Sequence, residues 1–151
     1  MVSFKVEPFS EFFSEAIELL KLHWEEVAPY KDIFTINPEL TRYHFLEENG
    51  NLCVVAARDE GKLIGYIVMI IAPHHHYQHI LAANDDLHFI HKDYRRGGLG
   101  SQMFKFVEEE MKKLGVKFIA MRTKVSHDHG KLFIHLGYEA MDIIYTKKLE
   151  A

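Results

Sequence analysis

The stretch HKDYRRGGLGS, residues 91–101, decides how the rest of this chain can be interpreted. The residues before it, 86–91, predict a strand, and those after it, from about Gly100, predict an amphipathic helix. Glycine occupies positions 97, 98 and 100, where the missing Cβ atoms permit positive φ and let a ligand approach the backbone. Amide groups at a helix N-terminus, with arginines beside them at 95 and 96, predict a site for a pyrophosphate.

The spacing of the glycines narrows the kind of phosphate ligand. A P-loop requires Gly-x-x-x-x-Gly-Lys-Ser/Thr, which the sequence lacks. A dinucleotide fingerprint starting at Gly98 would need glycine where Met103 stands. The motif that fits is Arg-x-x-Gly-x-Gly, filled by Arg95, Gly98 and Gly100. The alternative without a ligand is a glycine-rich turn that caps a helix and leaves two solvated arginines.

The hydrophobic pattern of the whole chain predicts alternating strands and helices in the order β-α-α-β-β-β-α-β-α-β. The expected strands are 2–6, 52–57, 63–71, 86–91, 117–124 and 138–149. The expected helices are 10–28, 37–49, 100–114 and 130–136. Such an order predicts an α/β (α+β) fold, with a mixed central sheet flanked by helices on both faces.

Composition limits the class of protein. The chain has 151 residues, 48% of them hydrophobic and 26% charged, which is typical of one globular domain over residues 1–151. A formal net charge of −4 argues against a nucleic-acid partner. The longest apolar run, 63–73, is broken by Gly65 and is too short for a membrane span. Residues 1–7 show no signal-peptide pattern, and the single cysteine, Cys53, fits a reducing compartment, so we expect a cytoplasmic protein.

Two stretches of the sequence resemble a known family. Residues 87–95, LHFIHKDYR, together with the glycine-rich turn, look like the fourth strand and acetyl-CoA-binding motif of the GNAT N-acetyltransferase superfamily. Residues 132–138, LFIHLGY, look like the helix-to-last-strand signature of that family, usually Leu-Tyr-Glu-Lys-Leu-Gly-Phe. The expected order of elements is also the family's order. The Pro-His-x-His-Tyr stretch at 73–77, followed by Asn-Asp, resembles uncharacterised phage- or prophage-encoded members.

The resemblance implies a single N-acetyltransferase (GNAT) domain that uses acetyl-CoA as co-substrate and needs no metal. The pantetheine arm would lie between the strands at 87–91 and 118–124, where backbone groups of Phe89, Ile90 and His91 would bind it. Ser126 would replace the family's usual asparagine near the fifth strand. The residues expected at the pyrophosphate are Arg95, Arg96, Gly97, Gly98, Leu99, Gly100 and Ser101.

A base is required, because an ammonium group must lose a proton before its nitrogen can attack the thioester. Alternation along a strand places Asp86 and His88 on one face and the odd-numbered residues on the other. We therefore expect Asp86 or His88 to be the base, and histidine is the side chain that titrates near neutral pH. The alternative is that Asp86 is a turn residue and His88 a half-buried packing residue.

The general acid is the main departure from the family's pattern. The tyrosine that often protonates the leaving thiolate falls on Phe133, which cannot donate a proton. The substitutes that the sequence offers are Tyr138, Tyr145 and His127. Alternatively the thiolate leaves without help, since a thiol pKa of about 8.5 makes it a fair leaving group.

Eleven histidines include a cluster at 74–79 and a pair at 127 and 129. In an extended segment only His74 and His76 would converge with a third ligand, and the spacing is not that of a known zinc site. A polar loop therefore fits better than a metal site. In the GNAT fold this loop would lie beside the acceptor, so we expect His74, His76 and His79 to influence which acceptor binds.

The sequence thus predicts direct transfer of an acetyl group from acetyl-CoA to a primary amine of a small molecule or a peptide. Two alternatives stay open. One is a non-catalytic acetyl-CoA-binding sensor or scaffold, and the other is a histidine-rich metal-binding protein. Because GNAT proteins often dimerise, a homodimer is a further expectation from the resemblance. The identity of the acceptor is not predicted.

Overall fold

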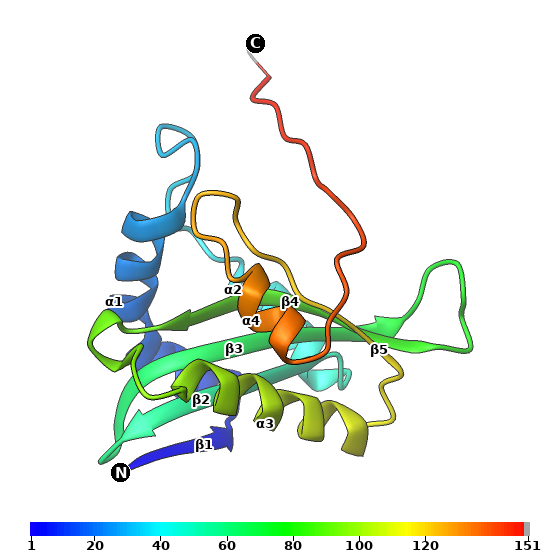
Figure 1. Ribbon diagram of the computed structural model, residues 1–151, viewed down its shortest axis with the longest axis horizontal. Coiled ribbons are helices and arrows are strands. Elements are labelled where there is room, and N and C mark those ends of the chain that lie inside the picture. Colours follow the sequence, from blue (N-terminus) through cyan, green and yellow to red (C-terminus); the bar gives the residue numbers. More distant parts are fainter. Residues whose placement is uncertain (150–151) are drawn as a thin grey trace.

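The computed structural model describes residues 1–149, which form a five-stranded sheet with helices on both faces (Figure 1). The strand order is β1-β2-β3-β4-β5; neighbours from β1 to β4 are antiparallel, and β5 is parallel to β4. No helix within 1–149 combines the length and apolar character that a membrane span requires. The elements are β1 (Val2–Val6), α1 (Phe9–Val27), α2 (Leu40–Glu48), β2 (Leu52–Asp59), β3 (Lys62–Pro73), β4 (Leu81–Ile90), a 3-10 helix η1 (Lys92–Tyr94), α3 (Leu99–Lys113), β5 (Phe118–Ala120) and α4 (Gly130–His135).

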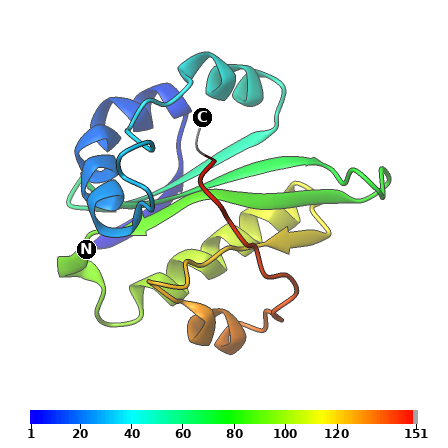
Figure 2. The same cartoon turned by 90° about the horizontal axis from the view of Figure 1, so that it is seen from above.

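The two helical layers come from different halves of the chain. Figure 2 shows α1 and α2 on one side of the sheet and α3 and α4 on the other. Both α1 and α3 bury apolar residues that are spaced mostly three or four apart, which is the periodicity of one helix face. In α1 these residues are Phe9, Phe12, Ala16 and Leu19. In α3 they are Leu99, Met103, Phe104, Val107 and Met111. Because helices cover both faces, the central strands β2 and β3 are nearly continuous apolar runs.

The expected fold class is confirmed, and the elements up to α4 lie near their predicted ranges. Two strand boundaries were predicted wrongly. β4 begins at Leu81 rather than at Asp86, because Ala82 and Ala83 are small and buried between β3 and β5. β5 is only three residues long and ends at Ala120, after which the chain leaves the sheet.

The predicted last strand, 138–149, is not formed. This segment is extended but has no sheet partner among the described residues, and Figure 1 shows it leading away from the sheet. Met141, Ile143 and Tyr145 are 73%, 77% and 89% exposed. The alternation of the sequence favours an extended backbone, but no strand lies beside it to pair with. The observed order therefore lacks the final β of the predicted order.

A β-bulge in β4 changes which side chains share a face. Val68 of β3 lies opposite Leu87, whereas the next residue, Met69, lies opposite Asp85, so Asp86 is the extra residue. Asp85 therefore faces α3, as His88 does, and Asp86 faces α2. The prediction that Asp86 and His88 share a face was wrong, since it assumed unbroken alternation.

Candidate active site

The turn between β4 and α3 presents a row of backbone N–H groups. Gly97 and Gly98 have φ values of 76° and 78°, a left-handed conformation that glycine adopts without strain. Gly98 is the N-cap of α3, and no side chain caps the helix. Within residues 1–149, no acceptor bonds the N–H groups of 96–101. Unsatisfied donors at the positive end of a helix form a site for an anion.

Gly100 is not required by the fold. Its φ is not positive, and a Cβ added there would lie 3.7 Å from Leu132 Cδ2 and 3.9 Å from Ile90 Cδ1, which are ordinary contacts. Gly65 differs, because a Cβ there would lie 2.8 Å from the carbonyl oxygen of Phe89. Packing explains glycine at 65, whereas neither packing nor backbone conformation requires glycine at 100.

The two arginines of the turn have different surroundings. Arg95 pairs with Glu26 of α1 through two hydrogen bonds of 2.6 and 2.7 Å, and its Nε donates to the carbonyl oxygen of Ile90 at 2.8 Å. Its guanidinium group also lies over the ring of Phe89. Arg96 is exposed and has no ion pair among the described residues. Arg95 therefore connects the turn to α1, and Arg96 is the cation that is accessible to a phosphate.

β4 and β5 separate beyond their first three residue pairs. Pairing extends from Ala82 and Phe118 to Asn84 and Ala120 and then stops. The N–H of His91 donates to Ile64 of β3 at 2.8 Å, so it is turned away from the opening. Because the backbone groups of successive residues point to opposite edges of a strand, those of His88 and Ile90 face the opening. The N–H of His91 is therefore already bonded within the sheet, and the expected binding of pantetheine by backbone groups of Phe89, Ile90 and His91 stays a prediction.

Asp85 and His88 form a buried carboxylate–imidazole pair on the α3 face. His88 Nδ1 lies 3.0 Å from Asp85 Oδ2, and the Asp85 side chain is 5% exposed. The backbone N–H of Arg122, beyond β5, donates to Asp85 Oδ1 at 3.1 Å, and the Arg122 side chain bonds the Asp85 carbonyl. The His88 ring makes edge contacts with Phe104 and Phe133. A carboxylate on Nδ1 leaves Nε2 as the atom that can accept a proton.

Asp86 has a separate environment on the α2 face. Its Oδ2 accepts a hydrogen bond of 2.5 Å from the hydroxyl of Tyr43. Burial, together with this carboxylate, raises the pKa of Tyr43, so its hydroxyl stays protonated and continues to donate. The two predicted base candidates thus lie on opposite faces of β4, and they cannot act on the same proton as a side-by-side pair.

Comparison with known proteins identifies the family. The profile described as the acetyltransferase (GNAT) family matches residues 16–138, which is most of the chain. This chain is a GNAT acetyltransferase. The comparison with curated proteins found no match. The resemblance to the family is confirmed, whereas the narrower resemblance to phage-encoded members stays a prediction.

Solved structures show the same fold at low sequence identity. An aminoglycoside acetyltransferase from an uncultured soil metagenomic sample has 15% identity and a TM-score of 0.73, over 99% of this chain and 96% of that one. Glucosamine-6-phosphate N-acetyltransferase from Arabidopsis thaliana has 14% identity and a TM-score of 0.74, over 99% of both chains. A Clostridium acetobutylicum protein described as a predicted acetyltransferase with acetyl-CoA has 16% identity and a TM-score of 0.73, over 98% and 96%.

The acetyltransferase has no tyrosine hydroxyl at the position where the sequence pattern expects one. Phe133 is buried against Phe104 and His88. Tyr138 packs on the Phe133 ring, but its buried hydroxyl has no hydrogen-bond partner within 1–149, and burial raises its pKa. A raised pKa makes Tyr138 a weaker proton donor to a thiolate. Of the other predicted substitutes, Tyr145 is exposed on the C-terminal segment. His127 is half-buried beside the predicted cofactor residue Ser126, whose Oγ lies 3.0 Å from His127 Nδ1.

The histidine cluster lies at the other end of β4 from the glycine-rich turn. It forms the loop that joins β3 to β4, with His74 Nδ1 accepting from the N–H of His76 at 3.1 Å. His79 lies in the same loop. Residues 1–149 contain no group of three His, Cys, Asp or Glu side chains placed to hold a metal ion. β4 has ten residues, which separate the loop from the turn by about 30 Å. The predicted influence of these histidines on the acceptor stays a prediction.

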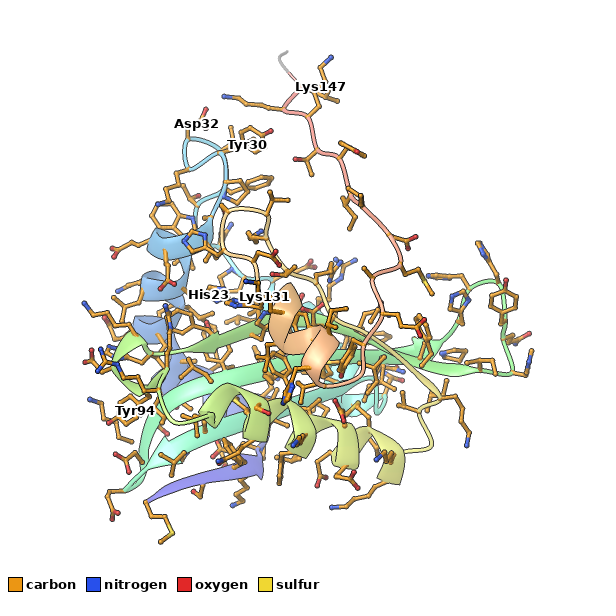
Figure 3. The ribbon with its side chains drawn as sticks, in the orientation of Figure 1. His23, Tyr30, Asp32, Tyr94, Lys131 and Lys147 are labelled. Carbon is orange, nitrogen blue, oxygen red and sulfur yellow. The ribbon has the colours of Figure 1, made fainter. Side chains whose placement is uncertain are left out.

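His23 of α1 is a polar residue of the site region that the sequence analysis missed (Figure 3). Its ring stacks on Phe89 of β4, and its Nδ1 lies 2.8 Å from the Tyr66 hydroxyl. Burial lowers the pKa of His23 to about 4, so the ring is neutral at pH 7. The available signal was spacing, because His23 follows the buried Leu19 by four residues on the same face of α1.

Proposed function

We propose that this protein transfers the acetyl group of acetyl-CoA directly to a primary amine of a small molecule or a peptide. The observation that carries the proposal is the turn before α3. It combines unsatisfied N–H groups at 96–101 with a glycine at position 100 that the fold does not require. Membership of the GNAT family supports acetyl transfer.

The proposed donor site has two parts. The pyrophosphate of acetyl-CoA binds the N–H groups of the turn, and Arg96 supplies a positive charge. The pantetheine arm enters between β4 and β5, where it bonds the backbone groups of His88 and the N–H of Ile90 in the manner of an added strand, while the carbonyl of Ile90 accepts from Arg95. A backbone N–H in this opening polarises the thioester carbonyl and stabilises the oxyanion that forms during attack.

In the proposed reaction the amine loses a proton, and its nitrogen forms a bond to the carbonyl carbon. The C–S bond then breaks, the thiolate of CoA leaves, and the second proton of the former ammonium group passes to solvent. His88 accepts the proton at Nε2, and Asp85 is the positioning residue that holds the ring through Nδ1. The thiolate leaves without an acid, because Phe133 has no proton to give and burial raises the pKa of the Tyr138 hydroxyl, which makes it a weaker donor.

Asp86 is the rival base. Its carboxylate already accepts a short hydrogen bond from Tyr43, and it lies on the opposite face from His88. We expect His88→Gln to lower kcat by about 100-fold or more. Asp86→Asn is the matched control, and we expect a loss of kcat of less than about tenfold. The opposite pattern would assign the base to Asp86.

We expect the acceptor to be a cation before deprotonation, because a lysine-like amine has a pKa of about 10.4 and carries a proton at neutral pH. Two similar structures carry names that specify an aminoglycoside and glucosamine-6-phosphate as acetyl acceptors. These names suggest amino sugars as the first compounds to test here.

Incubation with acetyl-CoA and a panel of amines tests the proposal. The panel holds an amino sugar, an amino sugar phosphate, a polyamine and a peptide with a free N-terminus. We expect thiol release together with an acetylated product for at least one amine, and loss of both for Gly98→Val. Binding of acetyl-CoA without any transfer would favour the sensor or scaffold alternative. Failure of the folded protein to bind acetyl-CoA would overturn the proposal.

A further inference from the structure

His23 of α1 is a half-buried polar residue that has no part in the reaction proposed above. Its Nδ1 lies 2.8 Å from the Tyr66 hydroxyl, whereas its Nε2 has no hydrogen-bond partner among residues 1–149. Nε2 is also not one of the fully buried side-chain atoms that lack a partner in this part of the chain, so it is accessible. Because polar atoms in a protein interior are normally paired, an accessible and unpaired ring nitrogen is open to a ligand.

The Tyr66 hydroxyl determines which nitrogen of His23 carries the proton. Tyr66 is fully buried, and burial raises the pKa of its hydroxyl, which therefore stays protonated. His23 Nδ1 is the hydrogen-bond acceptor that this hydroxyl meets within the described residues, so Tyr66 donates and Nδ1 accepts. Burial also lowers the pKa of His23 to about 4, so the ring is neutral at pH 7. A neutral ring that accepts at Nδ1 carries its hydrogen on Nε2.

The surroundings of the His23 ring place Nε2 beside the opening between β4 and β5. Tyr66 of β3 lies opposite Phe89 of β4 in the sheet register, and the His23 ring stacks on Phe89. Nδ1 points back to Tyr66, and the two ring nitrogens point in widely different directions, so Nε2 points away from β3 and past Phe89. His88 of β4 and Lys124, beyond β5, both contribute to the low pKa of His23, so the ring lies near both sides of the opening.

We propose that the Nε2–H of His23 donates a hydrogen bond to the carbonyl oxygen of the acetyl-CoA thioester. This inference rests on the proposed function, which puts the thioester in the opening between β4 and β5. A neutral imidazole suits the role, because its N–H can donate to an oxygen that becomes negative during attack. Since Nδ1 already accepts from Tyr66, His23 does not compete with His88 as the base. Tyr66 is a positioning residue, because it acts only through the tautomer of His23.

The thioester carbonyl of bound acetyl-CoA reports this hydrogen bond without any acceptor amine. Infrared difference spectra of acetyl-CoA, labelled with 13C at the carbonyl, measure the C=O stretch, whose frequency a hydrogen bond lowers. We expect a lower frequency on the wild type than in solution, and a return toward the solution value on His23→Leu. His23→Gln should keep the lower frequency, because its amide N–H can replace Nε2–H. His44→Leu, at an exposed position of α2, is the matched control and should behave as the wild type.

Binding measured on the same samples separates this inference from the proposed function. The Kd of acetyl-CoA should rise by less than about tenfold in His23→Leu, since one hydrogen bond to a neutral carbonyl contributes little to binding. If acetyl-CoA binds and the C=O stretch is the same on the wild type and on His23→Leu, the inference is overturned and the proposed function stands. If the folded wild type does not bind acetyl-CoA, both are overturned.

The tautomer and the kinetics give two further readouts. Long-range 1H–15N spectra without ligand should show the His23 proton on Nε2 in the wild type at pH 7, and both tautomers in Tyr66→Phe. A wild-type ring protonated on Nδ1 would overturn the inference. With an amine that the wild type acetylates, His23→Leu should lower kcat by about 100-fold, as the loss of one oxyanion donor does, and leave the KM of the amine unchanged. A higher KM of the amine with an unchanged kcat would assign His23 to the acceptor instead, and would also overturn the inference.

Discussion

Gly100→Ala separates a ligand-binding turn from a turn that only caps a helix. The added Cβ meets only Leu132 and Ile90 side chains at 3.7 and 3.9 Å, so the fold has room for it. Alanine is favoured over glycine in helices by about 0.5–1 kcal/mol. For a chain of this size that gain raises Tm by roughly 1–4 °C. The variant should therefore be as stable as the wild type or slightly more stable.

Although Gly100→Ala should not lower stability, it should weaken the binding of acetyl-CoA. If the pyrophosphate lies against the backbone at position 100, the methyl group removes at least one charge-assisted hydrogen bond, which contributes about 1.5–3 kcal/mol. That loss corresponds to a Kd for acetyl-CoA that is about 10- to 150-fold higher. Titration calorimetry measures the Kd, and a thermal melt of the same sample measures Tm.

The control is Gly50→Ala, beyond the C-terminus of α2. Gly50 has a φ of 70° with nothing within 4 Å of an added Cβ, so this substitution costs about 1 kcal/mol in backbone strain and should leave the Kd unchanged. An unchanged Kd in Gly100→Ala would refute the argument that the ligand approaches this backbone. A large fall in Tm would refute the claim that the fold does not require glycine there.

Three further predictions concern packing, the ion pair of the turn and pH. Gly65→Ala should lower the unfolding free energy by about 2 kcal/mol or more in urea titration, because its Cβ would lie 2.8 Å from the Phe89 carbonyl oxygen; a loss below about 0.5 kcal/mol would contradict this. Arg95→Gln and Glu26→Gln should weaken acetyl-CoA binding equally, by less than about fivefold, because the pair only positions the turn; tighter binding in Glu26→Gln would instead mean that freed Arg95 contacts phosphate. Burial lowers the pKa of His23 to about 4 from an unfolded value of 6.5, so the unfolded state binds a proton that the folded state does not. The free energy of unfolding therefore falls as the pH drops from 6.5 to 4, by about 2 kcal/mol between pH 7 and pH 4.5. This fall should be absent in His23→Gln.

The local features of the site were predictable from the sequence because local residues determine them. The glycines at 97 and 98 encode the turn, and the apolar spacing of α3 encodes the helix behind it. Each of these two features depends on residues that lie close together in the sequence. The motif and the order of elements were therefore sufficient to predict the family and the fold class.

The wrong prediction of the face on which Asp86 lies has a physical cause. Period-two alternation holds only in a regular strand, and the bulge opposite Val68 and Met69 adds one residue to β4. Nothing in the composition of the strand marks which residue is extra. The pairing of Asp85 with His88, three residues apart, follows from the bulge and could not be predicted without it.

Contacts between distant parts of the chain could not be predicted from the sequence either. Glu26 and Arg95 are 69 residues apart, and His23 meets Tyr66 and Phe89 only because α1 packs on the sheet. The C-terminal segment shows a related limit. Its alternation predicts a strand, and the structure has none there, because the neighbour that a strand needs is a property of the fold and not of the strand's own sequence.

The central claim is that acetyl-CoA binds the N–H groups of the turn before α3. Amide NMR spectra of the 15N-labelled protein, recorded during titration with acetyl-CoA, test it most directly. We predict that the resonances of Gly97, Gly98 and Gly100 shift strongly and saturably, while those of Gly50 and Gly61, in turns elsewhere, stay in place. Saturable binding that leaves the three turn glycines unmoved, or no binding at all, would contradict the account.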